Sequence, residues 1–286
     1  SESNGQIKEL IKLQKQARGE RMYFKTTVIA GKTIEVMKGY KRRVAKGKRA
    51  EKNRLTPEEM DKVNQKNAAK KLRWTIAANF QGGDFHVVLT YLRENRKTPE
   101  EAKKIVNKFI RTMRQEYKKI GAEFKYIHVT EYKNTSIHHH IIINNLEYVN
   151  VTSWVKKHWE YGRSKFTMLD DTGNYQKLAD YLIKETSKTF RENDGGHKQR
   201  YSCSRNLVHP EPVTTVVHAG KWRREPKPIK GYYIVPDSVN NGISNFDGYP
   251  FQSYIMVSLD AGMPEGLNKE QRDRWRRQKA EWELDK

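Results

Sequence analysis

Residues 123–144, EFKYIHVTEYKNTSIHHHIIIN, decide the fold of this chain. Two runs rich in β-branched and aromatic residues, 123–132 and 137–144, flank the polar residues Lys133, Asn134, Thr135 and Ser136. Such runs around a short polar segment are typical of two antiparallel strands joined by a turn. The sequence therefore predicts a hairpin here, and the rest of the fold can be worked out around it.

The register of this hairpin predicts a metal site. If residues 133–136 form a four-residue loop, Glu131 faces His138 and Val129 faces His140, because paired residue numbers keep a constant sum. Cross-strand partners have Cβ atoms about 5 Å apart, and residues two apart on a strand point to the same face. One face thus offers Glu131, His138 and His140 to a single divalent ion such as Mn²⁺, Mg²⁺ or Zn²⁺, and His139 points to the opposite face.

A bland alternative is that the three adjacent histidines are a polar strand edge or a chance metal-binding tract. The paired Glu131 and the apolar continuation 141–143 favour a buried, functional strand instead. A structural zinc site is disfavoured because it needs a fourth protein ligand, and Cys203 is the chain's one cysteine.

The flanking sequence predicts an α+β fold with a central antiparallel sheet and flanking helices. A β-rich run at 84–91 precedes Thr98-Pro99-Glu100-Glu101, which has the signature of a helix start and opens an amphipathic helix to about residue 120. Helices are also expected near Thr152 and at about 174–188, so strands and helices are mixed along the chain. Further helices are predicted at 6–18, 56–78 and 267–283, and hairpins around Ala30-Gly31 and between 231–235 and 251–257.

A second chemical feature lies on the helix at 174–188. Tyr181 and Lys184 are three residues apart and project from one helical face. A phenol is a poor nucleophile unaided, and a neighbouring cation favours its phenolate form. Taken alone, this spacing is weak, since a tyrosine on an amphipathic helix is usually a packing anchor.

The charge of the chain points to a polyanionic partner. Its 286 residues include 56 Lys plus Arg against 34 Asp plus Glu, a net charge of +22. An excess of this size is typical of proteins that bind nucleic acid or an anionic membrane. No apolar run is long enough to span a membrane, no secretory signal is apparent, and the single cysteine suits a reducing compartment. Residues 38–49, which include Arg42 and Arg43, form either a solvated basic linker or an arm that contacts phosphates.

Taken together, these motifs resemble the HUH endonucleases of the rolling-circle replication initiator (Rep) type. Residues 138–143 resemble the HUH motif, with His139 in place of an aliphatic residue at its centre. Residues 88–91, Val-Leu-Thr-Tyr, look like the family's first motif, and Tyr181 with Lys184 matches its YxxK motif. The order of the three motifs is that of Rep proteins, whereas relaxases place the tyrosine first. The resemblance covers roughly residues 74–190 and implies an RRM-like sheet.

The resemblance implies a function. Glu131, His138 and His140 would hold Mn²⁺ or Mg²⁺, and Tyr181, assisted by Lys184, would nick single-stranded or stem-loop origin DNA through a 5′-phosphotyrosine, leaving a 3′-OH primer. Expected partners are a DNA polymerase and a helicase of the bacterial host, in whose cytoplasm the initiator of a plasmid or other mobile element would act. No GxxxxGK[ST] motif is present, so the helicase would be a separate protein.

Three parts are expected: a basic N-terminal extension (1–73), the nuclease core (74–190) and a C-terminal extension (191–286). Candidate DNA-binding residues are Thr90, Tyr91, Lys177, Lys188, Arg42, Arg43 and Arg205. Two alternatives remain open: an HUH-class tyrosine transposase, and a non-catalytic basic protein that binds nucleic acid.

Overall fold

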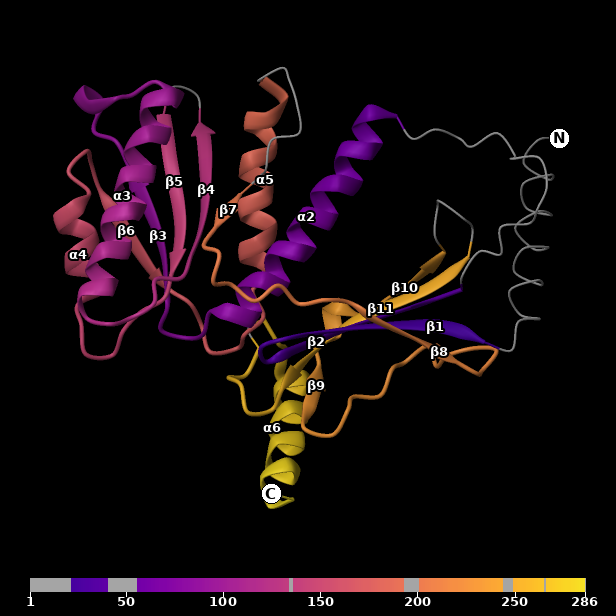
Figure 1. Cartoon of the computed structure of the whole chain (residues 1–286). Coiled ribbons are helices and arrows are strands. Elements are labelled where there is room, and N and C mark those ends of the chain that lie inside the picture. The colour runs from indigo at the N-terminus through magenta and orange to yellow at the C-terminus, as the bar shows by residue number, and fades with distance from the viewer. Residues whose placement is uncertain are drawn as a thin grey trace. The chain divides into compact units, whose positions relative to one another are not determined.

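The computed structural model describes residues 22–40, 56–133, 136–192, 201–243, 249–264 and 266–285. It confirms the α+β class, with two antiparallel sheets and flanking helices (Figure 1). The chain forms two compact units, one of residues 55–209 and the other of residues 1–54 with 210–286. The helix predicted at 6–18, together with Arg42 and Arg43, lies outside the described residues.

The central sheet of the 55–209 unit has five strands in the order β6-β3-β5-β4-β7, all antiparallel. They are β3 (Phe85–Thr90), β4 (Tyr126–Lys133), β5 (Ser136–Ile143), β6 (Ser164–Met168) and β7 (Ser202–Cys203). The predicted register is confirmed, since Glu131 pairs with His138 and Val129 with His140. β6 was not predicted, because its five residues are mostly exposed and show no apolar run.

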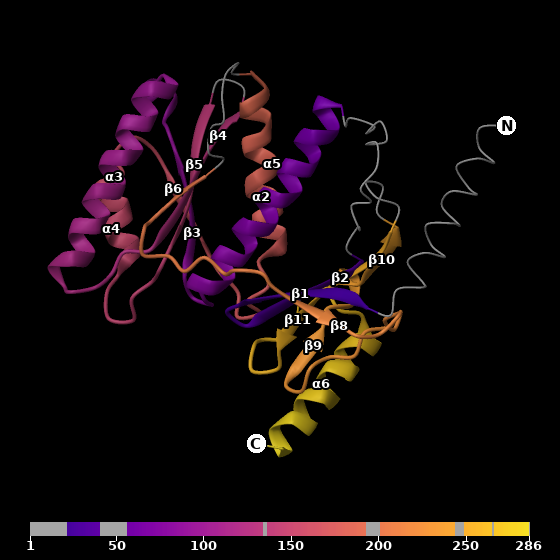
Figure 2. The same ribbon diagram turned by 45° about the vertical axis from the view of Figure 1, so that its right-hand side comes forward.

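Four helices cover the two faces of this sheet. α3 (Pro99–Lys119) and α4 (Val151–His158) lie on one face, and α5 (Gln176–Glu192) lies on the other with α2 (Pro57–Asn79) alongside it (Figures 1 and 2). α3 begins at the predicted capping box, in which the Thr98 backbone N–H donates to the Glu101 carboxylate at 2.9 Å. None of the helices in the described parts of the chain has the length and apolar character that crossing a bilayer requires.

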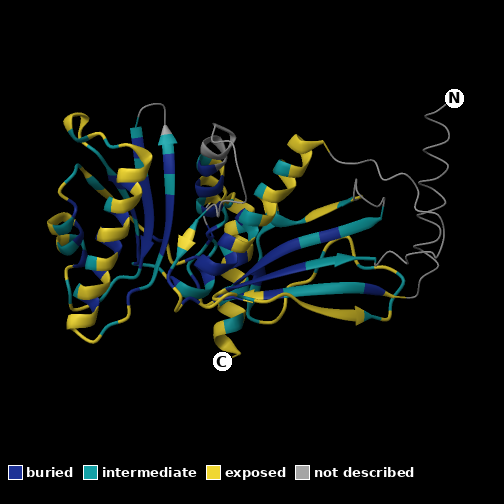
Figure 3. Ribbon diagram, turned by 45° about the horizontal axis from the view of Figure 1, so that its top comes forward, coloured by how far each residue is buried: buried dark blue, intermediate teal, exposed yellow. Residues whose placement is uncertain are grey.

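The α3 face carries the hydrophobic core of this unit. The inward side of α3 is buried and its outer side is exposed (Figure 3). Burying one large aliphatic or aromatic side chain contributes roughly 1.5–3 kcal/mol, so this face supplies most of the unit's stability. The core includes Val87, Leu89, Val106, Phe109, Ile110, Met113, Ile141, Ile143 and Trp159.

The second unit joins the two ends of the described chain in one sheet. Its strands are β1 (Tyr23–Ala30), β2 (Thr33–Gly39), β8 (Val213–Val217), β9 (Tyr232–Ile234), β10 (Asn240–Ile243) and β11 (Pro250–Ser258), followed by α6 (Lys269–Leu284). The predicted hairpin β1–β2 is confirmed, and β2 also pairs with β11. The two segments expected as separate extensions therefore form one unit, because strand edges pair regardless of their distance along the chain.

Gly162 lies beside the end of β3, where a side chain has no room. A Cβ there would sit 2.1 Å from the Thr90 carbonyl oxygen. Backbone hydrogen bonds of 2.9 Å, from Thr90 to Arg163 and from Leu92 to Tyr161, hold the two segments together. This close approach fixes the strand end that pairs with His138.

Gly162→Ala is expected to lower the free energy of unfolding by about 1–3 kcal/mol, because the new methyl group forces two backbone segments apart. Gly39→Ala is a matched control, since a Cβ at Gly39 meets nothing within 4 Å. Urea denaturation of both variants checks this, and equal stabilities would contradict it.

Candidate functional site

The β4–β5 hairpin brings three donor atoms together on the α5 face of the sheet. The Glu131 carboxylate oxygen Oε2 lies 2.9 Å from His140 Nε2 and 3.6 Å from His138 Nδ1. The Glu131 and His140 side chains are almost fully buried, whereas the His138 side chain is 27% exposed. The set is therefore anchored in the sheet on one side and open to solvent at His138.

These donors suit a divalent ion in chemistry and spacing. Donor atoms about 2.1 Å from one ion lie roughly 3.0–3.4 Å from each other, close to the two distances above. Among the residues that the structure describes, however, no group of three His, Cys, Asp or Glu side chains forms a completed metal site. The His140–Glu131 hydrogen bond fills the space between these two groups, so an ion would have to replace that bond.

Both buried groups favour the protonation states that metal binding requires. Burial lowers the pKa of His140 although the Glu131 carboxylate opposes this effect. Burial raises the pKa of Glu131, but hydrogen bonds with His140 and Glu185 outweigh it and hold that pKa below its usual value. At neutral pH the site therefore offers a neutral imidazole and an ionised carboxylate, the forms that bind metals.

Helix α5 brings a phenol to the same place. The Tyr181 ring contacts the His140 ring edge-on, with centroids 5.5 Å apart, and the tyrosine is 42% exposed. Burial, followed by the charges of Glu131 and Glu185, raises the pKa of Tyr181. The expectation that a neighbouring cation favours the phenolate is thus not met here, because the groups that shift this pKa are carboxylates. Lys184 is exposed on the same helix.

Glu185 was missed in the sequence analysis although it belongs to this site. It lies four residues after Tyr181, hence on the same helical face, and its side chain hydrogen-bonds to Glu131. The i, i+4 spacing from Tyr181 was the available signal. Glu185 brings a second carboxyl group to the predicted metal ligands.

His86 supports His140 from β3. His86 Nε2 lies 3.1 Å from His140 Nδ1, and the two rings stack with centroids 5.3 Å apart. Burial lowers the pKa of His86 to about 4, so it is neutral at pH 7. A partner on the second nitrogen of a metal-binding histidine fixes the ring's orientation and tautomer. From the sequence His86 was taken for a packed or edge histidine, with no part in the site.

His139 serves the opposite face. It is completely buried, and its ring nitrogens lie 3.1 Å from the Tyr91 hydroxyl, 3.1 Å from Thr130 Oγ1 and 3.2 Å from His128 Nε2. Burial lowers the pKa of His139 well below its usual value, so the ring is neutral. A histidine replaces an aliphatic residue here because its polar atoms find partners within the core. His128 is buried, as the sequence predicted.

The predicted DNA-binding residues are dispersed. Thr90 pairs with His138, and the Tyr91 hydroxyl points inward to His139. Lys177 and Arg205 are exposed. Arg42, Arg43 and the side chain of Lys188 lie outside the described part of the chain.

The comparisons with known proteins agree with this site. The family model of the replication-associated protein ORF2 matches residues 84–190, from β3 into α5. The matched segment holds all of the residues discussed above for metal binding and nucleophilic attack. No curated protein and no solved structure matches the chain. The family match indicates a replication-associated protein and is consistent with a rolling-circle initiator of the Rep type.

The two faces predict opposite outcomes for two neighbouring histidines. His139→Ala is expected to lower the free energy of unfolding by about 2–4 kcal/mol, because it opens a cavity and leaves buried partners unsatisfied. His138→Ala, at a partly exposed position, is expected to change it by less than about 0.5 kcal/mol. Urea denaturation measures both; a larger loss in the His138 variant would contradict the face assignment.

Proposed function

We propose that this protein is a metal-dependent, single-tyrosine DNA nickase that initiates rolling-circle replication. The observation that carries the proposal is the contact between the Tyr181 ring and His140, which is itself hydrogen-bonded to Glu131. A partly exposed phenol beside a convergent set of imidazoles and carboxylates is an arrangement that suits nucleophilic attack on a phosphate. The family match over residues 84–190 supports a role in replication.

Glu131, His138 and His140 would hold the ion, with Glu185 beside them. Bound Mn²⁺ or Mg²⁺ would polarise the scissile phosphate and offset its negative charge. The Tyr181 phenol oxygen then forms a bond to phosphorus while the bond to the 3′ oxygen breaks. The phenolic proton is given up and the 3′ oxygen gains one, so the products are a 5′-phosphotyrosine and a free 3′-OH. Lys184 would orient the phenol and stabilise the phosphotyrosine.

This chemistry suits an initiator. The phosphotyrosine keeps the energy of the cleaved phosphodiester, so the same site can rejoin the strand without ATP. The free 3′-OH serves as a primer for a DNA polymerase, and a separate helicase would open the duplex. A tyrosine transposase would share these active-site residues and would be distinguished by its substrate, transposon ends instead of an origin.

Tyr181→Phe is expected to abolish covalent capture of DNA, because the ring remains but the attacking oxygen is lost. The assay incubates a labelled pool of random single-stranded oligonucleotides with Mn²⁺ and looks for a protein–DNA adduct on a denaturing gel. Sequencing the captured DNA would also identify the nick site.

Tyr175→Phe is the matched control. Tyr175 is only 3% exposed and its hydroxyl donates to the Asp170 carbonyl at 3.1 Å, so it is not available for attack. Capture that persists in the Tyr181 variant would place the nucleophile elsewhere, and no capture by the unmodified protein would favour a non-catalytic nucleic-acid-binding protein.

Metal removal is expected to stop capture, and metal affinity is expected to fall in a graded way. His138→Ala with His140→Ala should abolish Mn²⁺ binding in calorimetry, whereas His86→Leu should weaken it by about 10–100-fold, as loss of an outer partner does. His158→Ala is the control, because His158 contacts Glu116 on α3 instead. Unchanged Mn²⁺ affinity in the double variant would contradict the proposed ligand set.

A further inference from the structure

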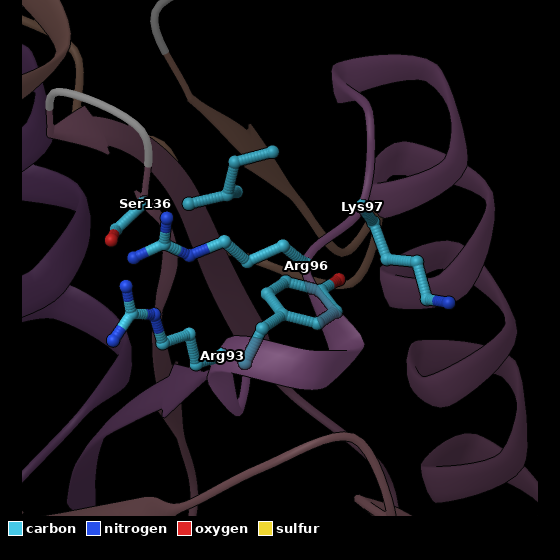
Figure 4. Close-up of a pocket in the computed structure, with 6 residues that line it drawn as sticks. Arg93, Arg96, Lys97 and Ser136 are labelled. Carbon is cyan, nitrogen blue, oxygen red and sulfur yellow. The ribbon is translucent and has the colours of Figure 1, made fainter.

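A basic pocket lies at the end of the sheet next to the proposed metal site. It has a volume of about 160 Å³. Arg93 and Arg96 come from the segment after β3, and Ser136 begins β5 (Figure 4). None of the six described lining residues is acidic; they are Tyr91, Arg93, Arg96, Lys97, Ser136 and Ile137.

The polar groups of the pocket are arranged for an anion with several oxygens. The guanidinium groups of Arg93 and Arg96 lie next to each other and close to Ser136, whereas the Lys97 side chain extends the other way (Figure 4). A guanidinium presents its N–H donors in a planar fork that matches two phosphate oxygens, and a serine hydroxyl adds one more donor. These three side chains together suit a phosphate group better than a single carboxylate.

The position of the pocket indicates which phosphate it would take. Ser136 precedes His138 by two residues on β5, a distance of about 7 Å along a strand. On the neighbouring strand, Tyr91 directly follows Thr90, which pairs with His138. A DNA strand whose scissile phosphate lies at His138 can therefore reach the pocket with one of the neighbouring linkages.

We infer that Arg93, Arg96 and Ser136 bind a backbone phosphate of the single-stranded substrate next to the scissile phosphate. This inference rests on the proposed function for the identity of the strand. The pocket contacts the sugar–phosphate backbone and leaves the bases unread, so it contributes affinity and register but no sequence preference. It also accounts for part of the chain's excess positive charge at a defined place.

The test uses binding without cleavage. Affinities of the full chain for a labelled dT20 oligonucleotide are measured in EDTA at several salt concentrations. Arg93→Ala with Arg96→Ala is expected to weaken binding about tenfold and to make the slope of log K against log[salt] shallower by about 0.7, the value for one phosphate of a single strand. The same loss is expected with a 20-mer of abasic sites, which keeps the phosphates and lacks the bases.

Arg111→Ala with Arg114→Ala is the matched control. It removes the same charge from exposed positions of α3 that do not line the pocket. The inference is overturned if both double variants lose affinity equally, if the loss appears with dT20 but not with the abasic oligomer, or if it appears with free dTTP alone.

This test is separate from the test of nicking. Covalent capture by the unmodified protein reports on Tyr181, whereas dT20 affinity reports on the pocket. If capture fails but the pocket variant still loses affinity, the proposed function falls and the phosphate site stands. If capture succeeds and the pocket variant binds like the unmodified protein, only the phosphate site falls.

Discussion

In the β4–β5 ladder Glu131 lies opposite His138, and every other feature of the site depends on that pairing. Strand side chains alternate between faces, so a slip of one residue would send His138 and His140 into the core and bring His139 out. The long apolar continuation of β5 makes such a slip costly, since it would also expose buried isoleucines. The hydrophobic core thus fixes the positions of the polar groups that it does not itself contain.

The sheet separates stability from chemistry. On the α3 face, buried apolar side chains surround His139, whose nitrogens are satisfied by neutral partners. On the α5 face, the polar groups lie close together and keep their lone pairs directed at one another. Burial acts differently on the two faces: on one it keeps a histidine inert, and on the other it keeps an imidazole neutral and available as a ligand. The family match covers both faces from β3 into α5.

Local patterns in the sequence were sufficient for the hairpin, its register and the ends of the main helices. Capping residues and alternating strands report on neighbours in the chain, which is why Thr98 and the 131–138 pair could be placed. Glu185 and His86 escaped because their importance comes from contacts between α5, β3 and the hairpin, which no local spacing encodes. The shared sheet of β2 and β11 was missed for the same reason, and the pKa of Tyr181 depends on carboxylates from two elements.

The chain order of the two units has a consequence for synthesis on the ribosome. Residues 55–209 are continuous and interrupt the other unit, whose strand β2 needs β11 from near the end of the chain. The inserted unit can complete its sheet while the β1–β2 hairpin still has an unpaired edge. Unpaired strand edges are prone to association with other chains. Early release of the polypeptide would therefore leave a finished nuclease unit attached to an aggregation-prone hairpin.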